Sequence, residues 1–318
     1  MWIPVSVSER GPRAAAAEKK RRGIYLLYHK KRMGTKHIKK RRAAVLSLAF
    51  LGVLILWTLW SNTALECNTY IVESHMLPAA FDGYRIAHIS DLHSAEMGTE
   101  NEKLLTMLRE AEPDMIAITG DLIDSRDTDV GIALRFTEEA VKIAPCYYVT
   151  GNHEASTSLY ADLRQGMMDQ GVVILENERS ELTRSGESIS ILGVNDPSVH
   201  KDFASDSDAR IMEGNLNALV KEEDSYTILL SHRPELFDLY VRSGVNLVLS
   251  GHAHGGQFRL PFIGGLIAPN QGLCPTYDAG MFSEDGTDMI VSRGIGNSVI
   301  PVRFHNRPEI VYVELRRN

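Results

Sequence analysis

Five short apolar runs, each followed directly by a polar motif, constrain the fold of this chain more than any other feature of its sequence. The runs resemble buried strands and cover Arg85–Ile89, Met115–Thr119, Cys146–Thr150, Tyr226–Leu230 and Asn246–Leu249. The motifs are Ile-Ser-Asp91-Leu-His93, Gly120-Asp121-Leu-Ile-Asp124, Gly151-Asn152-His153-Glu154, Ser231-His232 and Gly251-His252-Ala-His254-Gly-Gly. In open α/β sheets, sites are built at the C-terminal ends of the strands. The sequence therefore predicts that these polar residues gather at one such edge.

The motifs supply the donor types of a metal centre. His252 and His254 lie two positions apart among glycines and form a compact pair of imidazoles that strand packing would not demand. The Asp121 carboxylate can bridge two cations, and Asn152 adds a neutral oxygen. Mixed imidazole, carboxylate and amide donors suit Mn, Fe or Zn better than Ca²⁺ or an all-oxygen Mg²⁺ site. Two such ions are expected, with the candidate ligands Asp91, His93, Asp121, Asn152, His232, His252 and His254.

Two other motif residues are candidates for catalysis rather than metal binding. His153 is adjacent to Asn152 and is predicted to point into the substrate space, where it would stabilise transition-state charge or protonate the leaving group. Asp124 follows Asp121 by three residues and is predicted to orient a neighbouring side chain rather than to bind metal.

Composition and charge exclude several classes of function. The three cysteines, Cys67, Cys146 and Cys274, are too few and too scattered for a disulfide framework, and they lie outside the motifs. Residues 1–42 hold 14 basic and 2 acidic residues, a net charge of +12, so the remainder of this chain of net charge −7 carries −19. Because the body of the chain is this acidic, we expect no nucleic-acid partner.

An uncharged apolar segment, residues 43–61, predicts one membrane-spanning helix about 28 Å long. Basic residues 39–42 precede it, and Glu66 is the first charged residue after it. The positive-inside tendency then places residues 1–42 in the cytoplasm and the catalytic domain outside the cell membrane, in a single-pass topology. Trp57 and Trp60 suit the outer interface.

The predicted organisation is a basic cytoplasmic tail at 1–42, an anchor at 43–61, a linker at 62–80 and a catalytic domain at 81–318. A buried core helix, a cleaved signal peptide and a twin-arginine export signal are alternative interpretations of the apolar segment. Residues 1–32 are either a disordered tail or an over-extended start.

Strand and helix patterns alternate through the catalytic domain. Late strands are expected at Met289–Ser292 and Glu309–Leu315, and a β-rich portion at Val172–Asn195. Helices are expected near Glu100–Glu112, Asp129–Ile143, Ser158–Gln170, Asp206–Lys221 and Pro234–Ser243. This order predicts one α/β domain in which two mixed sheets pack face to face with helices outside.

The complete set of motifs resembles the calcineurin-like metallophosphoesterases, whose pattern D-x-H, G-D-x-x-D, G-N-H-E, H, G-H-x-H is present in full. The resemblance covers about Leu77 to Leu315. Later segments are similar to a membrane-anchored bacterial branch related to a cell-envelope phosphodiesterase: Gly251–Pro261, Asn270–Gly272, Tyr277–Gly280, Ser292–Asn297 and Arg303–Glu309.

The resemblance implies a four-layer α/β/β/α sandwich with a binuclear centre of Mn, Fe or Zn. One ion would take Asp91, His93, Asp121 and His254, and the second Asp121, Asn152, His232 and His252, with Asp121 bridging. His153 would match the family's acid and Asp124 its orienting partner.

The expected activity is hydrolysis of a phosphate ester by a hydroxide that bridges the two metals. Phosphodiesters and pyrophosphates are the expected substrates, and the branch resemblance adds lipid-linked or sugar-nucleotide pyrophosphates of the UDP-diacylglucosamine type. The alternatives are a nuclease or cyclic-nucleotide phosphodiesterase, and a catalytically idle metal-binding scaffold of the envelope. The apolar segment Leu260–Ile267 either forms a lipid-facing rim beside the metals or packs into the domain.

Overall fold

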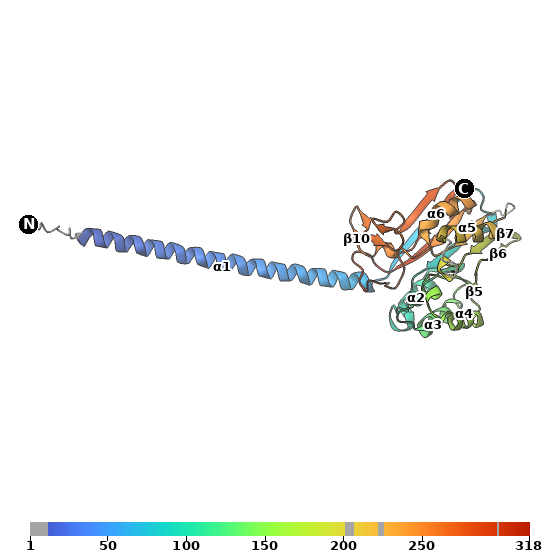
Figure 1. Cartoon of the computed structure of the whole chain (residues 1–318), viewed down its shortest axis with the longest axis horizontal. Coiled ribbons are helices and arrows are strands. Elements are labelled where there is room, and N and C mark those ends of the chain that lie inside the picture. Colours follow the sequence, from blue (N-terminus) through green and yellow to red (C-terminus); the bar gives the residue numbers. More distant parts are fainter. Residues whose placement is uncertain (1–11, 201–206, 222–225, 298) are drawn as a thin grey trace, which may run out of the picture. The chain divides into compact units, whose positions relative to one another are not determined.

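The computed structural model describes residues 12–200, 207–221, 226–297 and 299–318. The chain divides after Leu56 into two compact units, of which the second, Trp57–Asn318, contains every polar motif. Figure 1 shows the strands and short helices of this second unit. We describe each unit by itself.

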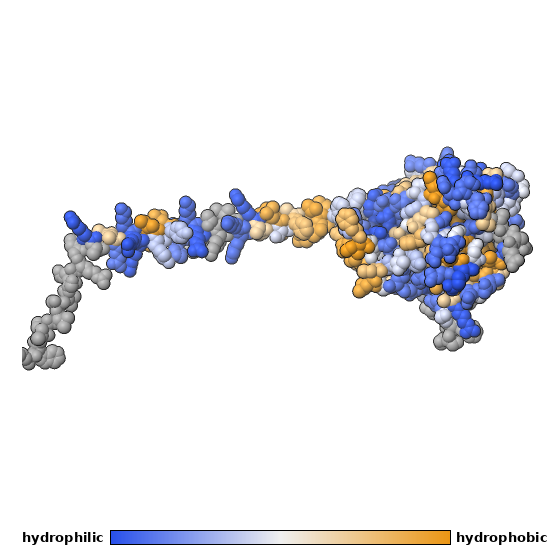
Figure 2. Space-filling model, turned by 90° about the horizontal axis from the view of Figure 1, so that it is seen from above, coloured by the Kyte–Doolittle hydropathy of each residue, from blue (hydrophilic) through white to orange (hydrophobic). Residues whose placement is uncertain are grey.

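The helix α1 extends well beyond the predicted anchor, from Pro12 to Thr63. Residues 12–32, for which a disordered tail was one interpretation, are therefore helical, and residues 1–11 lie outside the described part of the chain. The segment Lys39–Thr63 has a mean hydropathy of 2.2 and is long and apolar enough to cross a membrane. Figure 2 shows apolar residues along the C-terminal half of α1 and most of its charged residues along the N-terminal half.

The predicted linker at 62–80 is wrong, because strand β1 occupies Glu66–Glu73. This strand pairs in parallel with β16, Glu309–Arg316, along its whole length. Its side chains alternate between partly covered and exposed, as expected for a strand at the edge of a sheet. Only Ala64 and Leu65 separate its start from the end of α1, so the domain begins well before residue 81.

The first sheet has six strands in the order β1-β16-β2-β3-β4-β5. Its inner strands match the predicted apolar runs, while β16 runs antiparallel to β2. The remaining strands are β2 (Arg85–Ile89), β3 (Met115–Thr119), β4 (Cys146–Val149) and β5 (Val173–Ile174).

The second sheet also has six strands, in the order β14-β15-β9-β8-β7-β6. Its four inner strands are parallel and largely buried, and both outer strands pair antiparallel. The strands are β6 (Glu178–Arg184), β7 (Glu187–Gly193), β8 (Thr227–Leu230), β9 (Leu247–Ser250), β14 (Gly280–Glu284) and β15 (Thr287–Val291).

Two small hairpins follow β9. The first pairs β10 (Arg259–Leu260) with β11 (Gly264–Gly265), and the second pairs β12 (Ile267–Ala268) with β13 (Gly272–Leu273). Sequence periodicity did not predict these two-residue strands, because no alternation can be recognised over so few residues.

Helices cover the outer faces of both sheets, which gives the predicted α/β/β/α sandwich. One core contains side chains of both sheets, including Ile86, Ile191 and Leu249, so the sheets pack face to face. A second core packs the first sheet on α2 (Glu102–Ala111), α3 (Val130–Ala140) and α4 (Tyr160–Asp169). A third packs the second sheet on α5 (Asp208–Leu219) and α6 (Phe237–Ser243). Residue 206, the expected first residue of the α5 helix, lies outside the described residues.

Candidate metal centre

The polar motifs leave the C-terminal ends of five strands and meet at one place, as predicted. Asp91 and His93 follow β2, Asp121 follows β3, and Asn152 follows β4. The remaining ligand candidates follow β8 and β9 of the other sheet. The site therefore lies where the same edges of the two sheets come together.

Several candidate ligands at this site share a strained backbone conformation with a positive φ angle. Five candidate ligands have positive φ: Asp91 (52°), His93 (47°), Asp121 (52°), His252 (64°) and His254 (48°). Side chains other than glycine rarely adopt this left-handed conformation, and such strain persists where surrounding structure enforces it. The conformations turn the chain sharply after each strand, so that side chains close in sequence converge on one point.

The motif glycines make room for the ligands. A Cβ atom on Gly151 would lie 2.2 Å from Oδ1 of Asp121, and one on Gly251 would lie 2.3 Å from Oδ2 of Asp91. Gly120 has a φ of 86°, and its Cβ would lie 2.4 Å from the backbone nitrogen of Gly151. These three positions therefore require glycine for packing reasons alone.

Asp91, His93 and His254 form the first buried cluster of metal-binding side chains. Nε2 of His254 lies 3.3 Å from Oδ1 of Asp91 and 3.1 Å from Nε2 of His93. The backbone N–H of His252 donates to Oδ2 of Asp91 at 3.1 Å, which ties this cluster to the last motif.

Asp121, His232 and His252 form the second buried cluster. Nε2 of His232 lies 3.2 Å from Oδ2 of Asp121 and 3.1 Å from Nδ1 of His252. The same Oδ2 atom of Asp121 lies 3.6 Å from Nε2 of His93 in the first cluster. Asp121 therefore lies between the two clusters.

The donor set fits metal ions. Nδ1 of His232 donates to the carbonyl oxygen of Thr119 at 2.7 Å, which leaves Nε2, 3.2 Å from Oδ2 of Asp121, to bind a cation or, without one, a proton. Oδ1 of Asn152 is buried and has no hydrogen-bond partner among the described residues. A buried amide oxygen without a partner is costly unless a cation or a water accepts its lone pair, so Asn152 is compatible with a role as a metal ligand.

The electrostatics of the clusters also favour cations. Burial opposes ionisation of Asp91, yet the neighbouring imidazoles, His254 first, hold its pKa well below the usual range. Burial likewise disfavours a charged His232, but the Asp121 carboxylate raises its pKa to about 10. Burial lowers the pKa of His254 to about 3. The buried carboxylates thus stay ionised and are stabilised by positive charge in their surroundings.

His153 lies beside the first cluster, and its imidazole comes within 4.8 Å of donor atoms of His93 and Asp121. Its Nδ1 accepts a hydrogen bond from the backbone N–H of Ser125 at 3.0 Å, so in the neutral ring the proton is on Nε2. Burial lowers its pKa from the ordinary value, which favours this neutral form.

Asp124, the predicted orienting partner, lies 3.6 Å from Nδ1 of His153 and makes no hydrogen bond to it. Its carboxylate instead accepts hydrogen bonds from the side chain of Arg126, and this pairing brings its pKa to about 2 against the effect of burial. The backbone of Ser125 therefore orients the imidazole, and Asp124 provides a negative charge nearby.

Sequence reasoning assigned no role to Glu154, which ties two ligand loops together. Its buried carboxylate accepts backbone N–H groups of Asp121 and Gly151, both at 2.8 Å, and of Ile123 at 3.3 Å. Burial, and then the charge of Asp121, raise its pKa to about 7. An acid placed directly after His153 was the signal that could have identified it.

A second overlooked pair lies beside the second cluster. Asp196 follows β7 and accepts hydrogen bonds from Nε and Nη2 of buried Arg233, whose Nη1 lies 3.4 Å from Nε2 of His252. Asn195-Asp196 repeats the pattern of a polar pair after an apolar strand, so the same rule applied to the run Ile189–Val194 would have indicated it.

Comparisons with known proteins agree on one family. The sequence matches the calcineurin-like phosphoesterase family over residues 84–256. The uncharacterized metallophosphoesterase YkuE of Bacillus subtilis is 32% identical over 263 residues, which are 79% of this chain and 86% of that protein. YkoQ of the same organism is 25% identical over 85% of this chain and 98% of that protein. A transmembrane protein with metallophosphoesterase domain from Bos taurus is 30% identical over 78% of this chain and 56% of its own length.

Proposed function

The chain belongs to the calcineurin-like phosphoesterase family and is a metal-dependent phosphoester hydrolase, and from this premise we propose that it cleaves phosphodiester or pyrophosphate bonds with a binuclear metal centre. The observation that carries the proposal is the pair of buried His/Asp clusters that meet at Asp121. Burial of this many carboxylates and imidazoles has a high desolvation cost, which is expected at a functional site rather than in a purely structural core.

In the proposed centre, Asp91, His93 and His254 would hold one ion, and Asn152, His232 and His252 would hold the other. Asp121 contributes to both, which is supported by the position of its Oδ2 atom between His93 and His232. The unpaired Oδ1 of Asn152 supports an oxygen ligand there. The donor types favour Mn, Fe or Zn, as the sequence does.

When bound, two such cations supply Lewis acidity for the phosphoryl oxygens and activation of water. The protein's own contribution includes a proton donor. In the neutral ring His153 presents Nε2–H because the Ser125 N–H occupies its Nδ1, so Nε2 can donate a hydrogen bond to the departing oxygen. Full transfer of this proton requires the imidazolium form, in which Nδ1 is also protonated and exchanges the Ser125 contact for Asp124. The Asp124 charge 3.6 Å away would stabilise the imidazole when it is protonated. His153 could instead be a ligand of the first ion. The variant His153→Ala distinguishes a ligand from a proton donor.

A lipid-linked phosphoester is the proposed substrate class. An apolar groove of about 400 Å³ opens beside His254. Its walls include Ile267, Pro269, Val299 and Ile300, whereas polar atoms are few along it. A groove of this kind beside the phosphoryl site suits an acyl or prenyl chain better than a second sugar or a nucleotide base. The candidate span Lys39–Thr63 would keep the enzyme at such substrates.

The test of the metal centre is Asp121→Asn in the full chain. We expect the variant to lose at least one equivalent of bound metal, and to lose turnover of a nitrophenyl phosphodiester, because an amide cannot bridge two cations. The measurements are metal stoichiometry by elemental analysis and initial rates with added Mn²⁺. The matched control is Asp162→Asn, which removes the same charge from the exposed surface of α4. Full metal content with near-normal turnover in Asp121→Asn would reject the proposed centre.

A further inference from the structure

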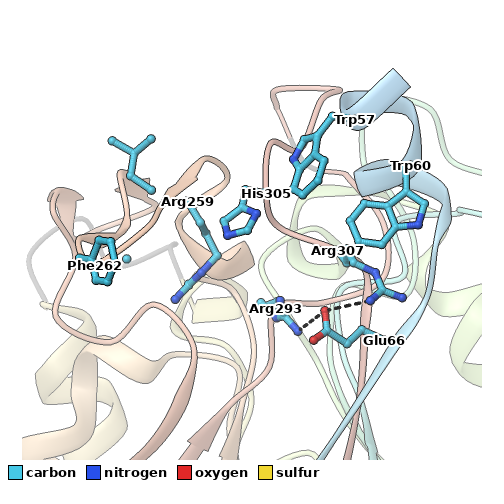
Figure 3. Close-up of a pocket in the computed structure, with 10 residues that line it drawn as sticks. Trp57, Trp60, Glu66, Arg259, Phe262, Arg293, His305 and Arg307 are labelled. Atoms are coloured by element: carbon cyan, nitrogen blue, oxygen red, sulfur yellow. Dashed lines mark ion pairs between the residues drawn. The ribbon is translucent and has the colours of Figure 1, made fainter. Parts of the chain in front are cut away.

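A second cavity, of about 440 Å³, lies in the unit 57–318. No candidate metal ligand is among its described lining residues. Figure 3 shows arginine side chains in its interior with aromatic rings on either side. The proposed activity uses none of these groups, so the cavity requires an explanation of its own.

Three arginines, Arg259, Arg293 and Arg307, face this cavity together with a single carboxylate, Glu66. Oε2 of Glu66 lies 3.2 Å from Nη2 of Arg293 and 3.6 Å from Nη1 of Arg307, so one acid is shared by two guanidinium groups (Figure 3). Arg259 comes from the β10 hairpin and is held by Asp278 at 2.9 Å. The lining thus contains three guanidinium groups and one carboxylate, while Asp278 and Glu309 pair with two of the arginines from outside the lining.

These arginines are pre-ordered for binding. Arg307 donates to the carbonyl oxygens of Ala64 and Leu65, and Arg293 also pairs with Glu309 through Nε at 3.1 Å. Because their conformations are already restricted, an incoming anion costs little further side-chain entropy. Planar guanidinium groups bind phosphate oxygens through paired N–H donors, and lysine does not reproduce this geometry.

Aromatic rings form the walls of the cavity. The Trp57 ring stacks on His305 at 5.8 Å between centroids, and the guanidinium of Arg307 lies 4.7 Å from the centre of the Trp60 ring. Phe262 stands on the other side with its side chain fully exposed (Figure 3). Arginines flanked by tryptophan and an exposed phenylalanine combine an anion site with an apolar border.

The two tryptophans also fix the level of this cavity with respect to a bilayer. Trp57 and Trp60 belong to the last turns of the candidate span Lys39–Thr63. Tryptophans at the end of a spanning helix sit at the headgroup level. A cavity lined by these same side chains therefore lies among lipid headgroups if the segment spans the membrane.

We propose that this cavity binds the phosphate of an anionic glycerophospholipid from the surrounding bilayer. The inference rests on the proposed membrane anchor and is independent of the reaction at the metal centre. The lipid phosphate would contact Arg259 and Arg307, with the glycerol backbone beside Trp57 and the acyl chains passing Phe262 into the bilayer. Such a lipid would hold the unit 57–318 against the membrane surface at a second point beside the helix.

The experiment uses the full chain in detergent, with retained lipid counted by native mass spectrometry after titration with phosphatidylglycerol. We expect saturable retention of one lipid. Arg259→Gln and Arg307→Gln should each weaken it roughly tenfold, the effect of one charge-assisted hydrogen bond. The matched control Arg109→Gln removes an exposed arginine that pairs with Glu139 at 3.2 Å on another face, and should bind like the parent.

Two further arms identify the source of the phosphate and protect against misfolding. Glycerol phosphate and inorganic phosphate are titrated alone, and equal affinity for either would overturn the lipid assignment. Each variant is checked for correct folding by thermal unfolding. Arg259→Lys keeps the positive charge but removes the paired N–H donors of the guanidinium, so it tests whether those paired donors are needed. Unchanged retention in Arg259→Gln and Arg307→Gln would also overturn it. Carbonate extraction of membranes separately tests the anchor, so its failure is distinguishable from failure of the lipid site.

Discussion

Single residues at the metal centre show how backbone strain and polar contacts are used together. Asp121 has a positive φ, its amide donates to Glu154, and its Oδ1 accepts the backbone N–H of His153 at 2.8 Å. The residue is thus held from three directions while Oδ2 remains directed toward both clusters. The strain is compatible with stability because these contacts over-determine the conformation.

His153→Ala tests the proton donor. We expect both metals to be retained and turnover to fall roughly 10²–10⁴-fold, the range for loss of a general acid. Phosphodiesters with poor leaving groups should be affected more than nitrophenyl esters, because a good leaving group departs without a proton. Metal content and rates across a leaving-group series provide the measurement. Loss of one ion would identify His153 as a ligand instead.

Glu154→Gln tests the positioning of the ligand loops. The amide keeps one acceptor oxygen where the carboxylate had two, so at least one of the N–H groups of Asp121, Gly151 and Ile123 loses its partner. We expect metal affinity to fall roughly 10–100-fold, with activity recovering at saturating metal. Competition with a metal chelator measures the affinity. The control is Glu176→Gln, a carboxylate that binds Tyr160 and Arg164 away from the centre, and an equal effect in both variants would contradict the positioning role.

At the scale of elements, the two short hairpins after β9 are additions to the two-sheet sandwich. The first half of the segment Leu260–Ile267 is exposed at Phe262 and Ile263, whereas Gly265 is buried and Leu266 is half-buried against the domain. The two ends of this segment line two different cavities. Ile267 lines the groove beside His254, whereas Leu260 and Phe262 line the arginine cavity. The expected apolar rim beside the metals is thus restricted to the Ile267 end.

Replacement of both Phe262 and Ile263 by Ser tests contact of this hairpin with lipid. Hydrolysis of a lipid-linked phosphoester in vesicles should fall severalfold, because apolar area is lost from the membrane-facing surface, while a soluble phosphodiester should be cleaved as before. The control replaces Leu159 and Met168 of the α4 region, which are also exposed, by Ser. Equal loss on both substrates would indicate structural damage and contradict the lipid contact.

At the scale of the whole molecule, the junction between α1 and the domain is short. Asn62 donates to the carbonyl oxygen of Arg303 at 2.8 Å, and its Oδ1 accepts the Arg303 N–H at 2.8 Å. With β1 starting at Glu66, no long linker lets the catalytic unit move tens of ångströms from the end of the helix. If the segment Lys39–Thr63 spans a membrane, this short junction supports the proposed membrane-bound substrate.

The orientation of the chain is tested with one native and one introduced cysteine. In a Cys67→Ser variant the exposed Cys274 should react with a membrane-impermeant maleimide in intact, wall-stripped cells, because the basic tail is expected inside. Gly23→Cys, in a chain with Cys67 and Cys274 replaced by Ser, should react only after lysis. Cys146 is buried and serves as the unreactive background. The reverse pattern of labelling would refute the proposed topology.

The sequence alone determined the architecture and which residues meet. Apolar runs of strand length ending in polar motifs predicted inner strands of both sheets but not the edge strands β1, β6 and β14. The convergence of Asp91, Asp121, His232 and His254 followed from the rule that sites lie at strand ends. These inferences succeeded because burial of whole strands and glycine-rich turns leaves a local pattern in the chain.

Only the tertiary structure decided what depends on long-range partners. Strand β1 was missed because half of its residues are polar and its pairing with β16 joins residues more than 240 positions apart. The role of Glu154, the contact of Ser125 with His153 and the sharing of Glu66 by two arginines likewise follow from side-chain geometry across loops. The residue pattern of a short polar segment does not indicate which distant residues it will contact. These contacts are therefore decided by the packing of the complete sandwich.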